Sequence, residues 1–196
     1  LIAATVRNYR VHREVTVEFD PASTLIGGPN ESGKSTFIEA VHRALFLKAQ
    51  VTGEPQRSMV SRTHPGHPEV EVDFEIDGTC YHLFKRFGGQ SGVARLTLVG
   101  GRTWLNEEAE TVLHGLLGVP EVGGGRGVAD RARRQWAHLW VWQGTSSDDP
   151  CQSAREQNDL LLKELQRRGG AVVMQSELDA RVAAWFAEAA DRAFVG

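Results

Sequence analysis

Residues 27–46 read GGPNESGKSTFIEAVHRALF, a run of small residues with one lysine that passes directly into an apolar, helix-like pattern. Its segment 28–35 matches G-x-x-x-x-G-K-[ST], the pattern of a phosphate-binding P-loop. Glycines at the fixed positions let the backbone approach a phosphate chain closely, because no Cβ atom is in the way. The N-terminus of the following helix adds N–H groups and the positive end of its dipole. The stretch therefore predicts a site for nucleotide phosphates.

Two side chains of this loop have distinct predicted tasks. Lys34 is expected to reach the β- and γ-phosphates as a point charge, and the Ser35 hydroxyl is expected to bind Mg²⁺. The simpler alternative is a glycine-rich turn that carries Lys-Ser by chance. An apolar strand over 23–28 and a helix from Ser35 are predicted on either side of the loop, and this context favours the phosphate site. The expected apolar face of that helix contains Phe37, Ile38, Val41, Leu45 and Phe46.

An antiparallel β-meander is predicted for much of the remaining lobe. Strand patterns occur at 1–6, 15–19, 69–76, 79–87 and 93–99. In the third of these, apolar residues alternate with acidic ones, which is typical of a strand with one wet face, and Asp77-Gly78 after it is a hairpin signal. Residues 50–68 are rich in proline, glycine and polar side chains and predict a loop or an insertion.

A second helix is predicted after the meander. Asn106 is expected to be its N-cap, with glutamates in the first turn at 107, 108 and 110, where the helix dipole favours acids. Its expected buried stripe contains Val112, Leu113, Leu116 and Leu117. The aromatic run WAHLWVWQG at 136–144 is predicted to form a further strand. Residues 1–150 are therefore interpreted as one lobe, and the helix-forming residues 151–196 as a lead-in to a coiled coil.

Composition bounds the class of protein. The 196 residues are 41% hydrophobic and 24% charged with a formal net charge of −3, which is typical of a globular protein and too near neutral to indicate nucleic-acid binding by itself. No run of about 18 apolar residues occurs, so no membrane span is predicted. The isolated Cys80 and Cys151 favour a reducing cytoplasm. The first residue is Leu1 rather than methionine, so we expect the sequence to be a piece of a longer protein.

The region around the loop resembles a known family. The stretch NYRVHREVTVEFDPASTLIGGPNESGKSTFIEA at 8–40 is similar to the start of the SMC-like ABC ATPases of DNA repair, the SbcC type. Gln143 in LWVWQG looks like the Q-loop glutamine of these ATPases, which lies just before their coiled coil. The resemblance implies an α/β P-loop NTPase fold, the N-terminal half of an ABC/SMC-type head, with an antiparallel β-meander and the base of a coiled-coil arm.

The same resemblance implies a set of site residues and two cofactors, ATP and Mg²⁺. The nucleotide would be bound by Arg10, Gly28, Pro29, Asn30, Glu31, Ser32, Gly33, Lys34, Ser35 and Thr36. Ser35 and Gln143 would contact the metal, and Lys34 and Gln143 would act in catalysis. Two of these residues have ordinary alternatives, since Arg10 could be a surface arginine and Gln143 a polar residue at a strand end.

Two elements that the family needs for hydrolysis are missing from this sequence. These are a hydrophobic strand ending in Asp-Glu and a signature loop of L-S-G-G type. Residues 70–75 contain acids that alternate with apolar residues, and residues 98–102 contain glycines at a hairpin turn, so we reject both as candidates. The resemblance therefore implies that a C-terminal ATPase half, in the same full-length chain or a separate one, supplies them. Alone, the chain is expected to lack efficient turnover as an ATP hydrolase.

The resemblance further implies a homodimer of heads, DNA as a partner and a nuclease subunit as another, in DNA repair or phage defence. A stand-alone P-loop kinase or NTPase and a non-catalytic ATP-binding module are the alternatives. A GTPase is disfavoured because the sequence has no N-K-x-D motif.

Several other residues have weaker interpretations. His64 and His67 could be metal ligands, although no supporting cluster accompanies them, and His12 could lie near the nucleotide or simply at the surface. Trp140 and Trp142 are expected to pack on one face rather than stack on bases. The arginines at 126, 131, 133 and 134 could touch a DNA backbone or form a solvated helix face.

Overall fold

The computed structural model describes residues 1–122, 125, 127–136, 140 and 142. The elements follow one another as β1 (Ala3–Tyr9), β2 (His12–Glu18), α1 (Lys34–Phe46), α2 (Glu54–Arg57), β3 (Glu69–Ile76), β4 (Thr79–Arg86), a 3₁₀ turn η1 (Gly89–Ser91), β5 (Val93–Leu98), β6 (Thr103–Leu105), α3 (Asn106–Leu117) and α4 (Val128–Arg133). The predicted coiled-coil base at 151–196 lies outside the described residues.

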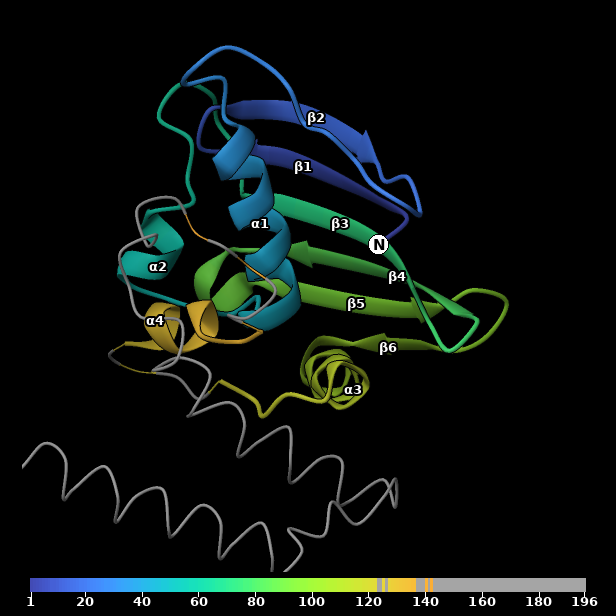
Figure 1. Ribbon diagram of the computed structural model, residues 1–196. Helices are drawn as coiled ribbons and strands as arrows, with labels where there is room; N and C mark the ends of the chain where they lie inside the picture. The colour runs from blue at the N-terminus through green and yellow to red at the C-terminus, as the bar shows by residue number, and fades with distance from the viewer. Residues whose placement is uncertain (123–124, 126, 137–139, 141, 143–196) are drawn as a thin grey trace, which may run out of the picture. The chain divides into compact units, whose positions relative to one another are not determined.

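Six strands form one sheet in the order β2-β1-β3-β4-β5-β6 (Figure 1). Every neighbouring pair in it is antiparallel. The predicted meander is confirmed by the consecutive hairpins from β3 to β6. Asp77 and Gly78, at the tip of the first of these hairpins, both have positive φ angles, of 51° and 75°, as a tight two-residue turn requires.

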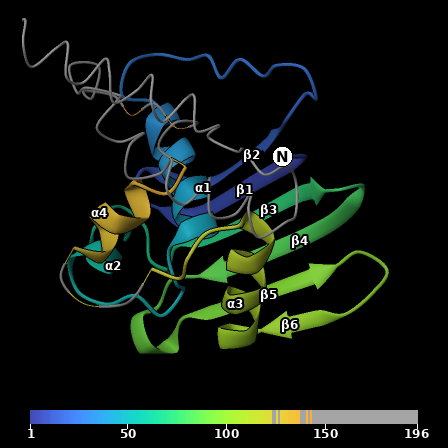
Figure 2. The same ribbon diagram turned by 60° about the horizontal axis from the view of Figure 1, so that its bottom comes forward.

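The helices α1 and α3 cover the same face of this sheet (Figure 1 and Figure 2). The alternation that was predicted for residues 69–76 is confirmed, because Val70, Val72 and Phe74 are buried beneath the helices while the acidic residues between them are at least partly exposed. On the helix side, Phe37 and Val41 of α1 are equally buried. Burial of one apolar face of the sheet against the helices is the main source of stability in such a layered domain.

Two local predictions are wrong. Residues 23–28 form no strand, and within the described residues no backbone–backbone hydrogen bond joins 24–28 to another segment. Asn106 is the first residue of α3 and not its cap: no side-chain cap bond is present, and Asn106 Oδ1 instead accepts a hydrogen bond from the Ala94 N–H at 3.3 Å. The loop or insertion predicted at 50–68 is irregular except for the four-residue helix α2 and a single bridge at Val60, in line with that prediction.

The aromatic run at 136–144 is described in part. Trp136, Trp140 and Trp142 are not in a strand, and the Trp140 N–H donates to the Trp136 carbonyl at 3.2 Å. The other residues of the run, including Gln143, lie outside the described residues. The expectation that Trp140 and Trp142 pack together is confirmed, since their rings stack with centroids 6.4 Å apart.

His42 of α1 is the centre of this aromatic packing. Its ring lies edge-on to Trp140 and Trp142, at centroid distances of 4.9 and 4.8 Å, and 4.6 Å from the ring of Phe46. Its Nε2–H donates to the Gln135 carbonyl at 3.3 Å. The residue is 1% exposed, and burial lowers the pKa of His42 to about 4, since the charged imidazolium loses its hydration there.

The free energy of unfolding should therefore depend on pH through His42. An unfolded histidine has a pKa near 6.5. Below that pH the unfolded chain therefore binds a proton at His42, whereas His42 of the folded protein stays neutral. Stability falls as the pH drops through this window, and the loss is complete below about pH 4. From pH 7 to pH 5, we expect denaturant titrations to show a fall about 2 kcal/mol larger for the wild type than for His42→Phe. Equal falls in the two proteins would contradict the conclusion that His42 causes the loss of stability. The control is His67→Ala, a change at an exposed histidine, which should behave as wild type.

Candidate nucleotide-phosphate site

The P-loop lies between β2 and α1, and the chain crosses from one to the other as coil (Figure 1). Residues 27–32 are exposed, and the first helical residue is Lys34. The first N–H groups of a helix have no acceptor within the helix. At the start of α1 no side chain caps them. A helix end of this kind favours an anionic group in front of it.

Lys34 turns its side chain back over the loop. Its ammonium group donates to the Gly28 carbonyl at 2.8 Å and to the Pro29 carbonyl at 2.5 Å, and it lies 3.5 Å from the Ser32 hydroxyl. The loop therefore encircles a positive charge. Glu31 at the tip has a φ of 64°, a left-handed conformation that is uncommon for a residue with a side chain.

Gly33 closes the loop in a conformation that few other residues tolerate. Its φ is 90°, and a Cβ atom added there would lie 2.5 Å from Cε1 of His12 and 2.8 Å from a methyl group of Val11. The turn between β1 and β2 thus packs directly against the end of the loop. The glycine at this position is required by both its backbone angle and this close contact.

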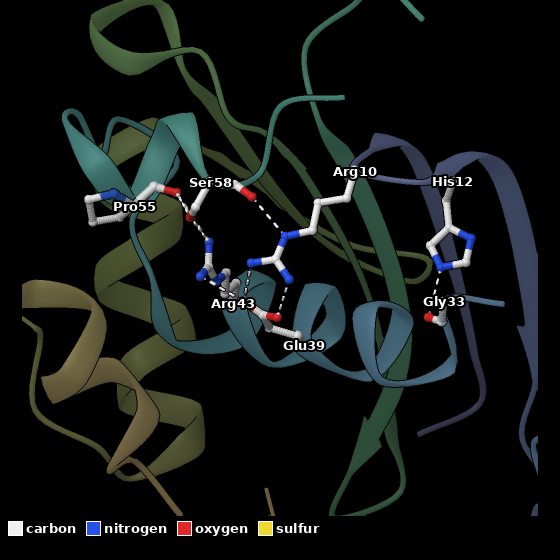
Figure 3. Close-up of polar contacts among 7 residues, drawn as sticks. All are labelled: Arg10, His12, Gly33, Glu39, Arg43, Pro55 and Ser58. Atoms are coloured by element: carbon white, nitrogen blue, oxygen red, sulfur yellow. Dashed lines mark hydrogen bonds and ion pairs between the residues drawn. The ribbon is translucent and has the colours of Figure 1, made fainter. Parts of the chain in front are cut away.

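A polar network anchors the middle of α1 to the β1–β2 turn (Figure 3). The Arg10 guanidinium makes two hydrogen bonds to the Glu39 carboxylate, at 2.7 and 3.0 Å, and a third to the Ser58 carbonyl at 2.7 Å. Glu39 also pairs with Arg43 at 2.6 Å, one helical turn further on. Arg43 in turn donates to the Pro55 carbonyl and to the Ser58 hydroxyl. Arg10 is therefore more than a surface arginine, because it joins α1 to the segment that follows α2.

A family model described as "AAA domain" matches residues 4–115, more than half of the chain, and includes the loop and the network. The chain belongs to this AAA domain family. The match makes it a P-loop NTPase, as the loop pattern predicted.

Several curated relatives of this AAA domain are named "DNA double-strand break repair Rad50 ATPase". The protein of Archaeoglobus fulgidus is 26% identical over 105 residues, covering 54% of this chain and 12% of that protein. The protein of Pyrococcus abyssi is 33% identical over 84 residues, covering 42% and 10%. These matches confirm the prediction of an SMC-like, SbcC-type ATPase N-terminal region. The matched part of the chain spans only about a tenth of the length of these relatives.

The residues present in the AAA domain fit an ATP triphosphate with Mg²⁺. The loop offers exposed backbone around the Lys34 ammonium, and the uncapped start of α1 adds N–H donors. Ser35 is exposed at the second residue of α1, and Thr36 beside it is half-buried, so hydroxyl oxygens, which suit a hard cation, stand at the loop end. Within the described residues no group of three or more histidine, cysteine or carboxylate side chains could hold a metal ion by itself.

Two contacts at the site were not predicted from the sequence. His12 is predicted to lie near the nucleotide or simply at the surface, and in the structure its Nε2 lies 2.9 Å from the Gly33 carbonyl. Glu39 of α1 is not among the residues predicted for the site, yet it binds Arg10, which is 29 positions away in the sequence. Nothing in the spacing of these residues signals either contact, because both depend on how the β1–β2 turn packs on α1. The histidines at 64 and 67 are not metal ligands together: His64 makes hydrogen bonds to neighbouring groups.

Proposed function

We propose that this chain is the ATP-binding half of an SMC-like ATPase that uses ATP-driven head dimerisation and hydrolysis to control DNA binding or processing. The observation that carries the proposal is the glycine loop that encloses the Lys34 ammonium at the uncapped start of α1. The names of the curated relatives favour DNA repair as the setting, and phage defence is the alternative. The proposed cellular location is the cytoplasm. Among the described helices, none is long and apolar enough to cross a membrane.

The roles of the individual residues follow from their chemistry. Lys34 would neutralise charge on the β- and γ-phosphates, and backbone N–H groups of residues 30–36 would bind the phosphate oxygens. Ser35 and Gln143 would contact Mg²⁺, which supplies further charge neutralisation when it is bound. Arg10, held by Glu39, retains two N–H groups beyond the three it uses and could direct them toward the nucleotide.

The catalytic glutamate and the signature loop are proposed to come from a C-terminal half. Residues 24–26 favour this partner, because the apolar side chain of Leu25 is 95% exposed in a segment whose backbone makes no backbone hydrogen bond within the described residues. An unpaired apolar segment of this kind is a template for strand pairing. We propose that it becomes a strand when the C-terminal half docks, which explains why the strand expected at 23–28 is absent from this chain alone.

A reconstitution experiment tests the function. We expect ATP hydrolysis with Mg²⁺ only when this chain and the C-terminal half are combined, and we expect it to be lost in Ser35→Ala and Gln143→Ala. Amides 24–27 should become protected from hydrogen exchange in the combined protein, and Leu25→Asp should prevent both protection and activity. The matched control is Val99→Asp, at another exposed apolar residue on a hairpin turn of the same domain, which should leave both unchanged.

Two results would reject the proposal in different ways. Binding of ATP without hydrolysis in the combined protein would support a non-catalytic ATP-binding module. Hydrolysis or phosphoryl transfer by this chain alone would support a stand-alone P-loop kinase or NTPase. We further propose that residues 1–150 form a lobe and that residues 151–196 lead into a coiled coil. The proposal also includes a homodimer of heads and DNA and nuclease partners. Crosslinking of the full-length protein in the presence of ATP and DNA would test these parts.

A further inference from the structure

His12 is the first residue of β2 and touches the last residue before α1 (Figure 3). Its Nε2 lies 2.9 Å from the Gly33 carbonyl oxygen. A carbonyl can only accept, so Nε2 carries the hydrogen and donates it. The same oxygen also accepts the first hydrogen bond of α1, from the Phe37 N–H at 2.8 Å. The Gly33 carbonyl is therefore bound by two donors, one from the helix and one from the β1–β2 turn.

The peptide group that His12 holds is the one that carries the Lys34 N–H. In a planar trans peptide the C=O and the N–H point in opposite directions, so fixing the Gly33 oxygen also fixes the direction of the Lys34 N–H. Two donors on one carbonyl polarise the peptide and strengthen its N–H as a donor in turn. This N–H is the first one at the start of α1, where a phosphate oxygen would be bound.

The ring of His12 is itself held in place. It lies against the α-carbon of Gly33 so closely that a Cβ atom there would be within 2.6 Å of both Cε1 and Nε2. The His12 carbonyl accepts a hydrogen bond from His64 Nε2 at 2.9 Å. His64 Nδ1 lies 3.0 Å from the hydroxyl groups of both Ser61 and Thr63. The segment 61–64 thus anchors the backbone of the residue that contacts the P-loop.

We infer that His12 is a positioning residue for the phosphate loop, which orients and polarises the Gly33–Lys34 peptide, and that His64 supports it from the segment after α2. This inference rests on the proposed nucleotide site for its function, but the geometry that it describes exists without a nucleotide. A surface histidine with no such task would leave the amide of Lys34 unaffected when it is replaced.

Four variants of the whole chain test the inference: His12→Phe, His12→Gln, His64→Ala and the control His67→Ala. His12→Phe keeps a ring but removes the donor, whereas His12→Gln keeps an amide nitrogen that can reach the same carbonyl. His67→Ala is the matched control, since it removes an exposed histidine from the neighbouring loop. Should His12→Phe fail to fold, His12→Asn replaces it, because its shorter side chain cannot bring a donor to Gly33. Each variant is measured by the amide NMR signal of Lys34 without nucleotide and by the affinity for a non-hydrolysable ATP analogue with Mg²⁺.

We expect one variant to change the Lys34 amide signal and the analogue affinity, and a second variant to restore both. His12→Phe should move the Lys34 amide proton upfield and weaken analogue binding about tenfold. A tenfold change in affinity corresponds to the free energy that one ordinary hydrogen bond contributes. His12→Gln should restore both, His64→Ala should give a smaller change of the same sign, and His67→Ala should match the wild type. A Lys34 amide and an affinity unchanged in His12→Phe, or an equal loss in His12→Gln, would overturn the inference.

The failure of this inference is distinct from failure of the proposed function. If Lys34→Ala loses analogue binding while His12→Phe binds as wild type, the nucleotide site stands and the role of His12 is rejected. If the wild type binds no analogue, the proposed function is rejected, and the Lys34 amide signal still decides whether His12 orients that peptide.

Discussion

Replacing Lys34 by alanine should weaken the binding of ATP with Mg²⁺ by about 100-fold. The substitution removes the one ammonium group that the P-loop carbonyls of Gly28 and Pro29 hold over the loop. A hydrogen bond to a charged group contributes roughly 1.5–3 kcal/mol, and about 1.4 kcal/mol corresponds to a tenfold change in affinity. Calorimetric titration with a non-hydrolysable analogue measures the effect directly.

The control for this substitution is Arg13→Ala. Arg13 is an exposed cation of β2, next to His12, and its loss changes the net charge by the same amount. We expect it to change the affinity less than threefold at physiological salt, because exposed charges are screened. An affinity of Lys34→Ala equal to that of Arg13→Ala would mean that the loop does not bind phosphate. The denaturation midpoint without nucleotide should change little in either variant, since both side chains are at least partly exposed.

Replacing Lys85 by alanine should lower the free energy of unfolding by about 3–5 kcal/mol. Lys85 of β4 is fully buried and pairs with the carboxylate of Glu110 on α3 at 2.6 Å, with a second bond to the Leu47 carbonyl at 2.9 Å. Burial lowers the pKa of Lys85, and the neighbouring Glu110 carboxylate opposes that shift. The other Glu110 oxygen accepts the Ala49 N–H at 2.9 Å. Removing the lysine leaves a buried charge without its counterion, which urea titration should detect.

Two further variants separate this effect from a general loss of packing. The double change Lys85→Met with Glu110→Leu removes both charges and should recover most of the lost stability, because no unpaired charge is left behind. Lys48→Ala breaks pairs with Glu107 and Glu121 whose members are all partly exposed, and we expect it to cost less than about 1 kcal/mol. A double variant as unstable as Lys85→Ala would show that shape rather than charge matters at this position.

Much of the strand and helix pattern could be predicted from the sequence because it depends on neighbours along the chain. The alternation of Val70, Val72 and Phe74 with acids determines which face of β3 is buried, whatever the strand pairs with. The Glu39–Arg43 pair follows from the geometry of a single helical turn. Glu110 shows the limit of such reasoning: in the sequence it is one of several acids near a helix start, and in the fold it is the counterion of a lysine 25 positions away.

The same limit applies to the candidate site. The sequence alone determined that a glycine loop with one lysine would precede an amphipathic helix, since a tight turn, a close approach and a helical period are all local properties. Only the tertiary structure decided that Arg10 binds Glu39 and that His12 contacts Gly33. The same is true of the backbone of 24–26, which makes no backbone hydrogen bond in the part of the chain that the structure describes. Contacts of this kind join residues that are distant in the chain. They depend on how the β1–β2 turn and the strands pack around α1, and no periodicity in the sequence encodes that packing.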